Sequence, residues 1–180
     1  MKIIAFSGYA RSGKDAAAEA LTGLGFRRLA FADKLREFVY AINPKVDSNG
    51  MITYLRDVID TYGWDGYKET KWADDIRRIL QVVGTEGGRK VIGENVWVDA
   101  TLNNLEDGKY VFSDVRFPNE ADAIRNMGGY VVRIIRPGIE PANNHPSETA
   151  LDRYYFNDVI HNDKSLEYFQ NLVRWLYAEV

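Results

Sequence analysis

A glycine-bounded loop near the start of the chain constrains its fold more than any other feature. The loop runs from Gly8 to Asp15, reads Gly-Tyr-Ala-Arg-Ser-Gly-Lys-Asp, and so contains the G-x-x-x-x-G-K pattern. An apolar run, residues 3–6, precedes the loop, and an amphipathic stretch, residues 16–24, follows it. This order predicts a strand, a loop and a helix whose N-terminus presents backbone N–H groups to a polyphosphate.

Two residues inside this pattern decide what the loop is expected to bind. Lys14 is predicted to reach the β- and γ-phosphates of a nucleotide. Asp15 stands where a Ser or Thr hydroxyl usually touches Mg²⁺, and a carboxylate there is repelled by a polyphosphate unless a metal ion or its water lies between them. Asp15 therefore either acts through Mg²⁺ or turns away to cap the helix. The bland interpretation, a glycine turn with a solvated lysine, is disfavoured by the strand directly before the loop.

Composition and charge limit the remaining possibilities. A chain of 180 residues with 46% hydrophobic residues can bury one core, which predicts a single domain over residues 1–180. A net charge of −3 argues against a dedicated nucleic-acid-binding protein. The absence of cysteine excludes disulfides and thiolate metal sites and suits a reducing cytoplasm. No apolar run has the length of a membrane span or a signal peptide, so we expect a cytoplasmic protein without a membrane partner.

Strand and helix patterns alternate along the chain. Predicted strands cover residues 3–6, 26–31, 109–113, 130–135 and 158–161. Predicted helices cover residues 11–24, 33–42, 53–61, 76–83, 98–105, 118–127 and 165–177, with loops at 44–51, 63–70 and 84–89. Asp33 is the expected N-cap of the second helix, and Gly84 is expected to end the fourth. The alternation predicts an α/β fold with a parallel sheet and helices on both of its faces.

Ligands of such sheets bind at the carboxyl ends of the strands, which brings further charged residues to the rim that carries the loop. Asp114 ends a strand of the buried type, where an acid commonly supplies a second anchor for Mg²⁺. Arg116, two residues later, is a candidate for a bidentate phosphate contact. The alternatives are that Asp114 caps a turn and that Arg116 is solvated.

A second group of polar residues is expected on a helix farther along the chain. Arg77 and Gln81 share one helix face because they lie four residues apart. The polar, glycine-rich loop predicted at residues 84–89 follows and contains Thr85, Glu86 and Arg89. These residues either line a substrate pocket or form a solvated surface, and the spacing alone does not choose.

A proline-bearing segment at about residues 136–153 is expected to act as a lid. Arg136 opens it at the sheet rim, where an arginine can neutralise charge in a phosphoryl-transfer transition state. His145 and Glu148, within it, are candidate substrate contacts. The Asn162-Asp163 pair follows the last predicted strand, where it would either approach a nucleobase or only cap the final helix.

Taken together, these motifs resemble the phage-type deoxynucleoside monophosphate kinases, a branch of the P-loop nucleotide kinases. The most distinctive match is the block from Asp114 to Glu120, Asp-Val-Arg-Phe-Pro-Asn-Glu. The other matching segments are Phe6–Gly8, Arg11–Asp15, Phe31–Leu35, Arg77–Gln81, Gly84–Glu86, Asn95–Val98, Arg136–Gly138, His145–Glu148 and Asn162-Asp163. That family also carries Asp after the loop lysine, so Asp15 agrees with the resemblance.

The resemblance implies a P-loop kinase-like, three-layer α/β/α fold with a five-stranded parallel sheet in the order 2-3-1-4-5. It implies ATP and Mg²⁺ as cofactors and a deoxynucleoside monophosphate as acceptor, in DNA precursor synthesis. The implied catalytic residues are Lys14, Arg11, Arg116 and Arg136, and the implied metal ligands are Asp15 and Asp114. The implied nucleotide contacts are Gly8, Ala10, Arg11, Ser12, Gly13, Lys14, Asp15, Ala16, Asn162 and Asp163. The implied acceptor contacts are Asp33, Arg36, Arg77, Gln81, Thr85, Glu86, Arg89, Trp97, Asp114, Arg116, Glu120, His145 and Glu148, with acceptor-binding helices at about residues 33–105.

Two alternatives stay open at this point. One is a kinase of another small phosphorylated acceptor, such as phosphomevalonate or dephospho-coenzyme A. The other is a nucleotide-binding switch or packaging-type ATPase module without an acceptor. The acidic balance of the chain and its acceptor-side arginines favour the nucleotide kinase. The segment between the second helix and Arg77 is shorter than in larger family members, so base selectivity and a homodimeric state are left undecided.

Overall fold

The computed structural model describes residues 1–103, 105–141 and 146–177, and these divide into two compact units. The first unit holds the described residues of 1–31 and 101–180, and the second holds residues 32–100. The sequence alone predicted one domain with acceptor-binding helices at about residues 33–105. The second unit coincides almost completely with that segment.

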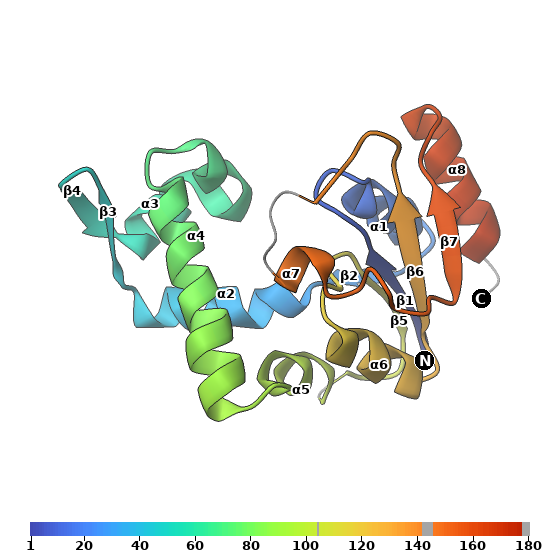
Figure 1. Ribbon diagram of the computed structural model, residues 1–180, viewed down its shortest axis with the longest axis horizontal. Coiled ribbons are helices and arrows are strands. Elements are labelled where there is room, and N and C mark those ends of the chain that lie inside the picture. The colour runs from blue at the N-terminus through green and yellow to red at the C-terminus, as the bar shows by residue number, and fades with distance from the viewer. Residues whose placement is uncertain (104, 142–145, 178–180) are drawn as a thin grey trace. The chain divides into compact units, whose positions relative to one another are not determined.

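The first unit is built on a five-stranded sheet in the order β2-β5-β1-β6-β7 (Figure 1). The strands are β1 (Lys2–Ser7), β2 (Arg27–Leu29), β5 (Lys109–Phe112), β6 (Tyr130–Ile135) and β7 (Asp158–His161). All four pairings are parallel, and β1 at the centre pairs with both β5 and β6. If only these five strands are counted, from the N-terminus onward, their order in the sheet is 2-3-1-4-5. The predicted fold class and strand order are therefore confirmed.

Helices cover both faces of this sheet. On one face α1 (Lys14–Thr22) packs against α8 (Leu166–Tyr177), and on the other α6 (Pro118–Asn126) contacts β1 and β6 (Figure 1). The short helix α7 (Pro146–Thr149) precedes β7 in the chain. Ile4 and Phe6 of β1 are completely buried in the cluster beneath α1 and α8. The central strand is apolar on both faces because helices cover both, as parallel sheets require.

The second unit is mainly helical. Its elements are α2 (Phe31–Ile42), β3 (Lys45–Ser48), β4 (Met51–Tyr54), α3 (Leu55–Gly66), a 3₁₀ turn (Tyr67–Glu69), α4 (Ala73–Gln81), a π-helical segment (Val82–Ile92) and α5 (Val96–Leu102). The helices pack around a buried group that includes Val39, Leu55 and Ile76. This unit therefore has an apolar core of its own, separate from the core beneath the sheet of the first unit.

The loop predicted at residues 44–51 is wrong, because this segment forms a β-hairpin. Strands β3 and β4 pair antiparallel, with Ser48 opposite Met51. Asn49 and Gly50 connect them with φ values of 52° and 85°. Two central residues with positive φ make the turn that suits the twist of a two-residue hairpin, and Asn-Gly is its most favourable sequence. The helix expected from Thr53 consequently begins later, at Leu55.

The predicted glycine-rich loop at residues 84–89 is also wrong, because the chain continues from α4 into the π-helical segment through Ile92. A Cβ at Gly84 would lie 2.8 Å from a methyl carbon of Leu35, and a Cβ at Gly88 would lie 2.7 Å from the Trp97 ring. The glycines therefore permit close packing onto neighbouring side chains and do not end a helix. The sequence pattern shows the glycines but not the partners they approach.

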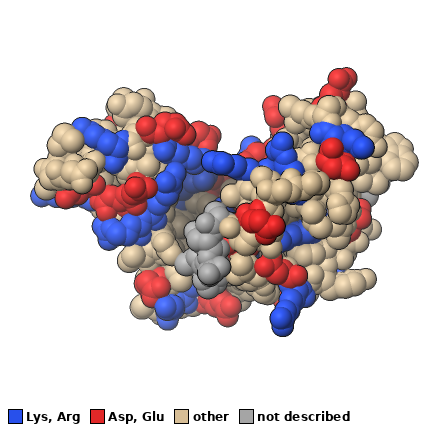
Figure 2. All heavy atoms as spheres, turned by 45° about the horizontal axis from the view of Figure 1, so that its top comes forward, with Lys and Arg blue, Asp and Glu red and all other residues tan. Residues whose placement is uncertain are grey.

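The surface carries both signs of charge. Figure 2 shows Lys and Arg side chains interspersed with Asp and Glu over the visible face of each unit. Within the described residues, none of the helices combines the length and the apolar character needed to cross a bilayer.

Candidate active site

The phosphate-loop pattern folds as a tight turn between β1 and α1. Gly8 and Gly13 have φ values of 151° and 110°, and Arg11 has a φ of 66°. A Cβ at Gly8 would lie 2.6 Å from the carbonyl oxygen of Ile134, and a Cβ at Gly13 would lie 2.5 Å from Nδ2 of Asn162. Both positions thus exclude a side chain, and the predicted strand–loop–helix arrangement is confirmed.

The loop has the features of a polyphosphate cradle. Helix α1 begins at Lys14, and its N-cap, Gly13, makes no side-chain hydrogen bond to the first turn. Backbone N–H groups at such an end bind anions because the helix dipole is positive there. The Ser12 hydroxyl is buried and has no hydrogen-bond partner among the described residues. A buried orphan hydroxyl inside an anion-binding turn fits a ligand oxygen as its partner.

Lys14 is folded back onto its own loop. Its ammonium donates hydrogen bonds of 2.7 Å to the carbonyl oxygens of Gly8 and Tyr9. Burial, together with the nearby Arg116 guanidinium, lowers the pKa of Lys14 to about 8. The ammonium is therefore a desolvated charge in a region of other positive charges. A phosphate oxygen would offer it a better partner than two neutral carbonyl groups.

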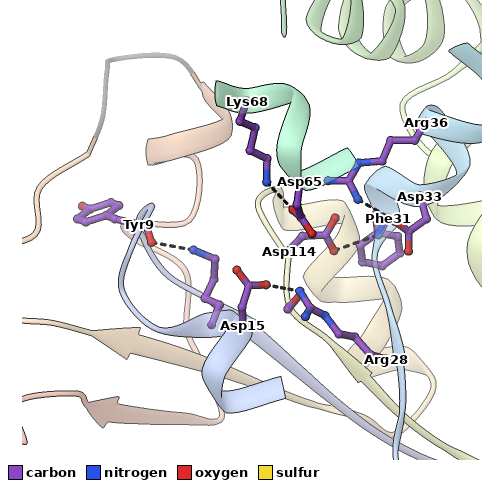
Figure 3. Close-up of polar contacts among 11 residues, drawn as sticks. Tyr9, Asp15, Arg28, Phe31, Asp33, Arg36, Asp65, Lys68 and Asp114 are labelled. Carbon is purple, nitrogen blue, oxygen red and sulfur yellow. Dashed lines mark hydrogen bonds and ion pairs between the residues drawn. The ribbon is translucent and has the colours of Figure 1, made fainter. Parts of the chain in front are cut away.

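The two predicted metal ligands both have protein partners in this structure (Figure 3). Asp15 forms an ion pair with Arg28, which also donates to Oγ of Ser113 at 3.0 Å. Asp114 accepts a 3.0 Å hydrogen bond from the backbone N–H of Phe31, the first residue of α2. Asp114 thus caps α2, and the predicted N-cap role of Asp33 is wrong because the helix begins two residues earlier.

The donor set around the loop is compatible with Mg²⁺. The Asp15 carboxylate is 78% exposed beside the start of α1 and so stays open to a ligand. The described residues contain no group of three or more His, Cys, Asp or Glu side chains that could hold a metal on their own. Mg²⁺ in nucleotide sites uses one or two carboxylates, substrate phosphates and water, so a dedicated protein cage is not required.

Arg116 shares a small pocket with the phosphate loop. Its guanidinium forms a 3.0 Å ion pair with Oε1 of Glu148. The other oxygen of Glu148 is buried and has no partner in the described part of the chain. The pocket is lined by Ser7, Gly8, Ala10, Lys14, Val115, Arg116, Arg133, Glu148 and Leu151. The structure therefore brings together Lys14, Arg116 and Glu148, three residues predicted from separate motifs.

Asn162 and Arg136 brace the phosphate loop from the neighbouring strands. Asn162 donates from Nδ2 to the carbonyl of Ser12 at 2.9 Å, while its backbone N–H bonds to the carbonyl of Ile135 at 2.8 Å. Arg136 lies 3.4 Å from the carbonyl of Arg11. These contacts give Asn162 a structural task in addition to the predicted approach to a nucleobase. Contact of Asp163 with a nucleotide stays a prediction.

In the second unit, the predicted acceptor residues are held by local contacts. Arg36 pairs with Asp33 at 3.0 Å, and Arg77 pairs with Asp74 at 3.2 Å. Glu86 pairs with Lys90 at 2.7 Å, and Arg89 donates to the carbonyl of Glu94 at 3.2 Å. A hollow of about 430 Å³ is lined by Asp33, Arg36, Glu37, Tyr40, Asp60 and Trp64. Of the predicted acceptor residues of this unit, Asp33 and Arg36 line the hollow, and its lining does not include Arg77, Gln81, Thr85, Glu86, Arg89 and Trp97.

Two side chains predicted to contact the acceptor are buried and form hydrogen bonds within the protein instead. Glu120 is 3% exposed and accepts hydrogen bonds from the backbone N–H groups of Arg116 and Phe117, which caps α6. Trp97 is 7% exposed and donates from its indole N–H to the carbonyl of Gly84. The structure assigns packing and capping roles to these side chains, and it offers no support for direct substrate contact. His145 lies outside the described residues.

Sequence reasoning did not include Arg133, Asp152 and Tyr9 in the site. Arg133 lines the pocket with Lys14, and it also contacts Asp152 and the Tyr9 ring. Tyr9 was predicted only as a member of the phosphate loop, and Arg133 only as one of the arginines that flank the proline-bearing segment. No sequence pattern pointed to Asp152.

Comparison with known proteins identifies the family. The model of the deoxynucleotide monophosphate kinase family matches residues 66–173. A protein of Acanthamoeba polyphaga mimivirus that bears the family's name is 31% identical over 193 aligned positions, which cover 96% of this chain and 94% of that protein. The deoxynucleotide monophosphate kinase of Escherichia phage RB69 is 33% identical, but the match covers 51% of this chain and 40% of that enzyme. The aligned region thus spans well under half the length of the phage RB69 enzyme.

A solved structure supports the fold. Dephospho-CoA kinase from Campylobacter jejuni aligns over 99% of this chain and 97% of its own, with a TM-score of 0.53 and 17% sequence identity. At this identity the likeness shows a shared fold alone. The family match covers more than half of the chain, and the mimivirus relative aligns nearly end to end. The chain therefore belongs to the deoxynucleotide monophosphate kinase family.

Proposed function

We propose that this chain transfers the γ-phosphoryl group of ATP to the 5′-phosphate of a deoxynucleoside monophosphate, giving ADP and a deoxynucleoside diphosphate. Family membership supports kinase chemistry. The observation that carries the proposal is the pocket that Lys14, Arg116 and Arg133 line beside Gly8. Three cations beside a phosphate-binding turn suit a site where two phosphate groups must approach each other against their mutual repulsion.

On the nucleotide side, the loop from Gly8 to Ala16 would hold the phosphates of ATP. Lys14 would exchange its two carbonyl partners for β- and γ-phosphate oxygens, and Arg11 would add a second positive charge. Asp15 and Asp114 would supply oxygen ligands to Mg²⁺, completed by phosphate oxygens and water. When bound there, Mg²⁺ would neutralise charge on the phosphates of ATP.

Phosphoryl transfer requires the enzyme to position the reactants and to neutralise charge, and it does not require a covalent intermediate. The bond between the γ-phosphorus and the bridging oxygen breaks, and an oxygen of the acceptor phosphate forms the new bond. Lys14, Arg116 and Arg136 would neutralise the charge that spreads over the transferring group. Holding both reactants in line supplies much of the rate enhancement.

On the acceptor side, Arg116 and Arg77 are the proposed partners of the monophosphate. Asp33 and Glu86 would contact its sugar or base, and the other proposed acceptor contacts are Arg36, Gln81, Thr85, Arg89 and Glu148. The local ion pairs of Arg36 and Arg77 support this proposal, because exposed pairs of this kind contribute little and can be exchanged for a ligand.

The proposal includes a cytoplasmic enzyme that acts on free nucleotides, without a nucleic-acid or membrane partner. Phage relatives and the absence of cysteine agree with this setting. Sedimentation of the purified chain decides between a monomer and a homodimer.

A panel of acceptors tests the function. ATP and Mg²⁺ would be incubated with dAMP, dCMP, dGMP, dTMP and modified pyrimidine monophosphates, with release of ADP as the readout. We expect ADP release that requires one or more of these acceptors. Phosphomevalonate and dephospho-coenzyme A serve as competing acceptors, and ADP release with either of them alone would contradict the proposal. ADP release that needs no acceptor would indicate an ATPase module.

A further inference from the structure

Tyr9, the second residue of the phosphate loop, belongs to a closed triangle of side chains. Its hydroxyl donates a 2.9 Å hydrogen bond to Oδ1 of Asp152. The Arg133 guanidinium forms a 3.0 Å ion pair with the same carboxylate oxygen and lies 4.6 Å from the centroid of the Tyr9 ring. Each of the three side chains therefore contacts the other two, although they come from the loop, from β6 and from the segment after α7.

Arg133 is the anchor of this triangle. Its side chain is only 11% exposed, and it rises from the interior of the sheet on β6. It also lies 3.5 Å from Oγ of Ser7 at the end of β1, and 5.7 Å from the Phe156 ring. A desolvated guanidinium that stacks on aromatic rings and pairs with a carboxylate has a fixed position, and a lysine cannot reproduce both contacts.

The triangle connects directly to Lys14. The carbonyl of Tyr9 is one of the two groups that hold the Lys14 ammonium, at 2.7 Å. Fixing the Tyr9 side chain holds its Cα in place, and the 3.1 Å hydrogen bond that the Ser12 N–H donates to the Tyr9 carbonyl restricts where that carbonyl can point. The direction of that carbonyl in turn sets where the ammonium lies before ATP arrives. A shift of about 1 Å in a positioned group can cost about a hundredfold in rate.

We infer that Arg133 is a positioning residue for phosphoryl transfer, which acts through the Tyr9 ring and Asp152 to hold the phosphate loop in the conformation that places Lys14. The inference rests on the proposed function for its effect on turnover. Its effect on ATP binding concerns the loop alone and can be measured without an acceptor.

Calorimetric titration of ATP with Mg²⁺ tests the inference on the full chain. We expect Arg133→Lys and Asp152→Asn to weaken ATP binding about tenfold each, and Tyr9→Phe to weaken it about threefold because the ring still stacks on Arg133. In steady-state kinetics the KM for ATP should rise and the KM for the acceptor should stay unchanged. Asp152 has an exposed surface position, so Asp152→Asn serves if Arg133→Lys does not fold.

Arg125 provides the matched control. It also stacks on tyrosine rings, 6.0 Å from Tyr154 and 5.7 Å from Tyr155, and it donates to a backbone carbonyl, but it lies on α6 and does not line the pocket. Arg125→Lys should therefore leave ATP affinity unchanged. We expect its melting temperature to fall by about as much as that of Arg133→Lys.

Three outcomes would overturn the inference. Lowered melting temperatures with wild-type ATP affinity would mean that the triangle is only structural. A rise in the acceptor KM alone would mean that Arg133 touches the acceptor directly. An equal loss of ATP affinity in Arg125→Lys would mean a general effect of stacked arginines. A wild-type chain that binds ATP with Mg²⁺ but phosphorylates no acceptor would instead refute the proposed function and leave the binding comparison valid.

Discussion

The two regions proposed to bind substrate differ in how their charged side chains are held. The phosphate loop of the first unit is fixed by residues distant in the chain, with Asn162 bound to the carbonyl of Ser12 and Arg133 stacked on Tyr9. The arginines of the second unit are held by their own helices. Arg36 and Arg77 each pair with an aspartate three residues earlier.

This difference suggests that the nucleotide site is preformed and the acceptor site is adaptable. Long-range contacts fix a loop before its ligand arrives, so little ordering is left for binding to accomplish. Exposed pairs within a helix contribute about 0.2–1 kcal/mol, and a substrate phosphate can replace them at small cost. We therefore expect nucleotide-side substitutions to act sharply on chemistry and acceptor-side substitutions to act on substrate affinity.

The largest effect is expected at Lys14, the residue on which the preformed site depends. Lys14→Ala removes the charge that would follow the γ-phosphoryl group, and transfer should fall by about 10²–10³-fold, as for other lost electrostatic stabilisers. Circular dichroism and the melting temperature should stay close to wild type, because the ammonium contacts only loop carbonyls. Steady-state ADP release with saturating acceptor measures the loss.

Lys45 on β3 gives the control for this variant, since it is exposed on the hairpin of the second unit. Lys45→Ala should leave the rate unchanged. A Lys14→Ala enzyme that retains near-normal turnover would remove the basis for a preformed nucleotide site.

The second effect concerns Arg116, a residue of the first unit that is proposed to bind the acceptor phosphate. Arg116→Ala should raise the acceptor KM about 10- to 50-fold, the range expected for losing hydrogen bonds to a charged group, and leave the ATP KM nearly unchanged. Glu148→Gln provides a companion, because it releases Arg116 from its 3.0 Å ion pair without removing the guanidinium. If Arg116→Ala changes only the KM for ATP, this arginine contacts the nucleotide and not the acceptor. The assignment of Arg116 to the acceptor would then be wrong.

The two regions also differed in how much the sequence revealed. The loop and the start of α6 follow from short patterns whose chemistry is local, such as the Gly8–Lys14 spacing and Pro118 at a helix start. The order of the sheet was predicted from the family resemblance, not from a local pattern. The Arg133–Tyr9–Asp152 triangle joins residues up to 143 positions apart, and no local pattern specifies such a contact. The glycines at 84 and 88 look like loop residues until Leu35 and Trp97 are seen to occupy the space of their side chains.

The third prediction asks whether the adaptable region nevertheless has a tightly packed backbone. A Cβ at Gly88 would lie 2.7–2.9 Å from three atoms of the Trp97 ring, and a rigid ring cannot move aside. Gly88→Ala should therefore destabilise the protein by about 1–3 kcal/mol, as overpacking does. Gly87→Ala is the control, because its Cβ would meet only a carbonyl oxygen at 3.8 Å. Denaturant unfolding compares the two, and equal stability would show that the second unit is loosely packed there.

The smallest effect comes from pH and concerns the protonation of Lys14 in the free enzyme. Burial and Arg116 lower its pKa to about 8, so the ammonium is lost as pH rises through that value. Binding of ATP needs the charged form, and kcat/KM for ATP should fall about tenfold between pH 7 and pH 9. Lys14→Arg, which stays charged, should show a flat profile over this range.

The lowered pKa of Lys14 affects stability in the opposite direction to ATP use. This distinguishes deprotonation of Lys14 from general unfolding at high pH, which would lower both activity and stability. Because the folded pKa lies below that of the unfolded chain, the unfolded state binds more protons between about pH 8 and pH 10.5. The contribution of Lys14 to the free energy of unfolding therefore rises with pH in this window while ATP use declines. Comparing denaturant unfolding of wild type and Lys14→Ala at pH 7 and pH 9 isolates that contribution. A wild-type kcat/KM that stays flat to pH 10 would mean that the ammonium of the free enzyme is not desolvated, and the preformed nucleotide site would then resemble the adaptable acceptor region.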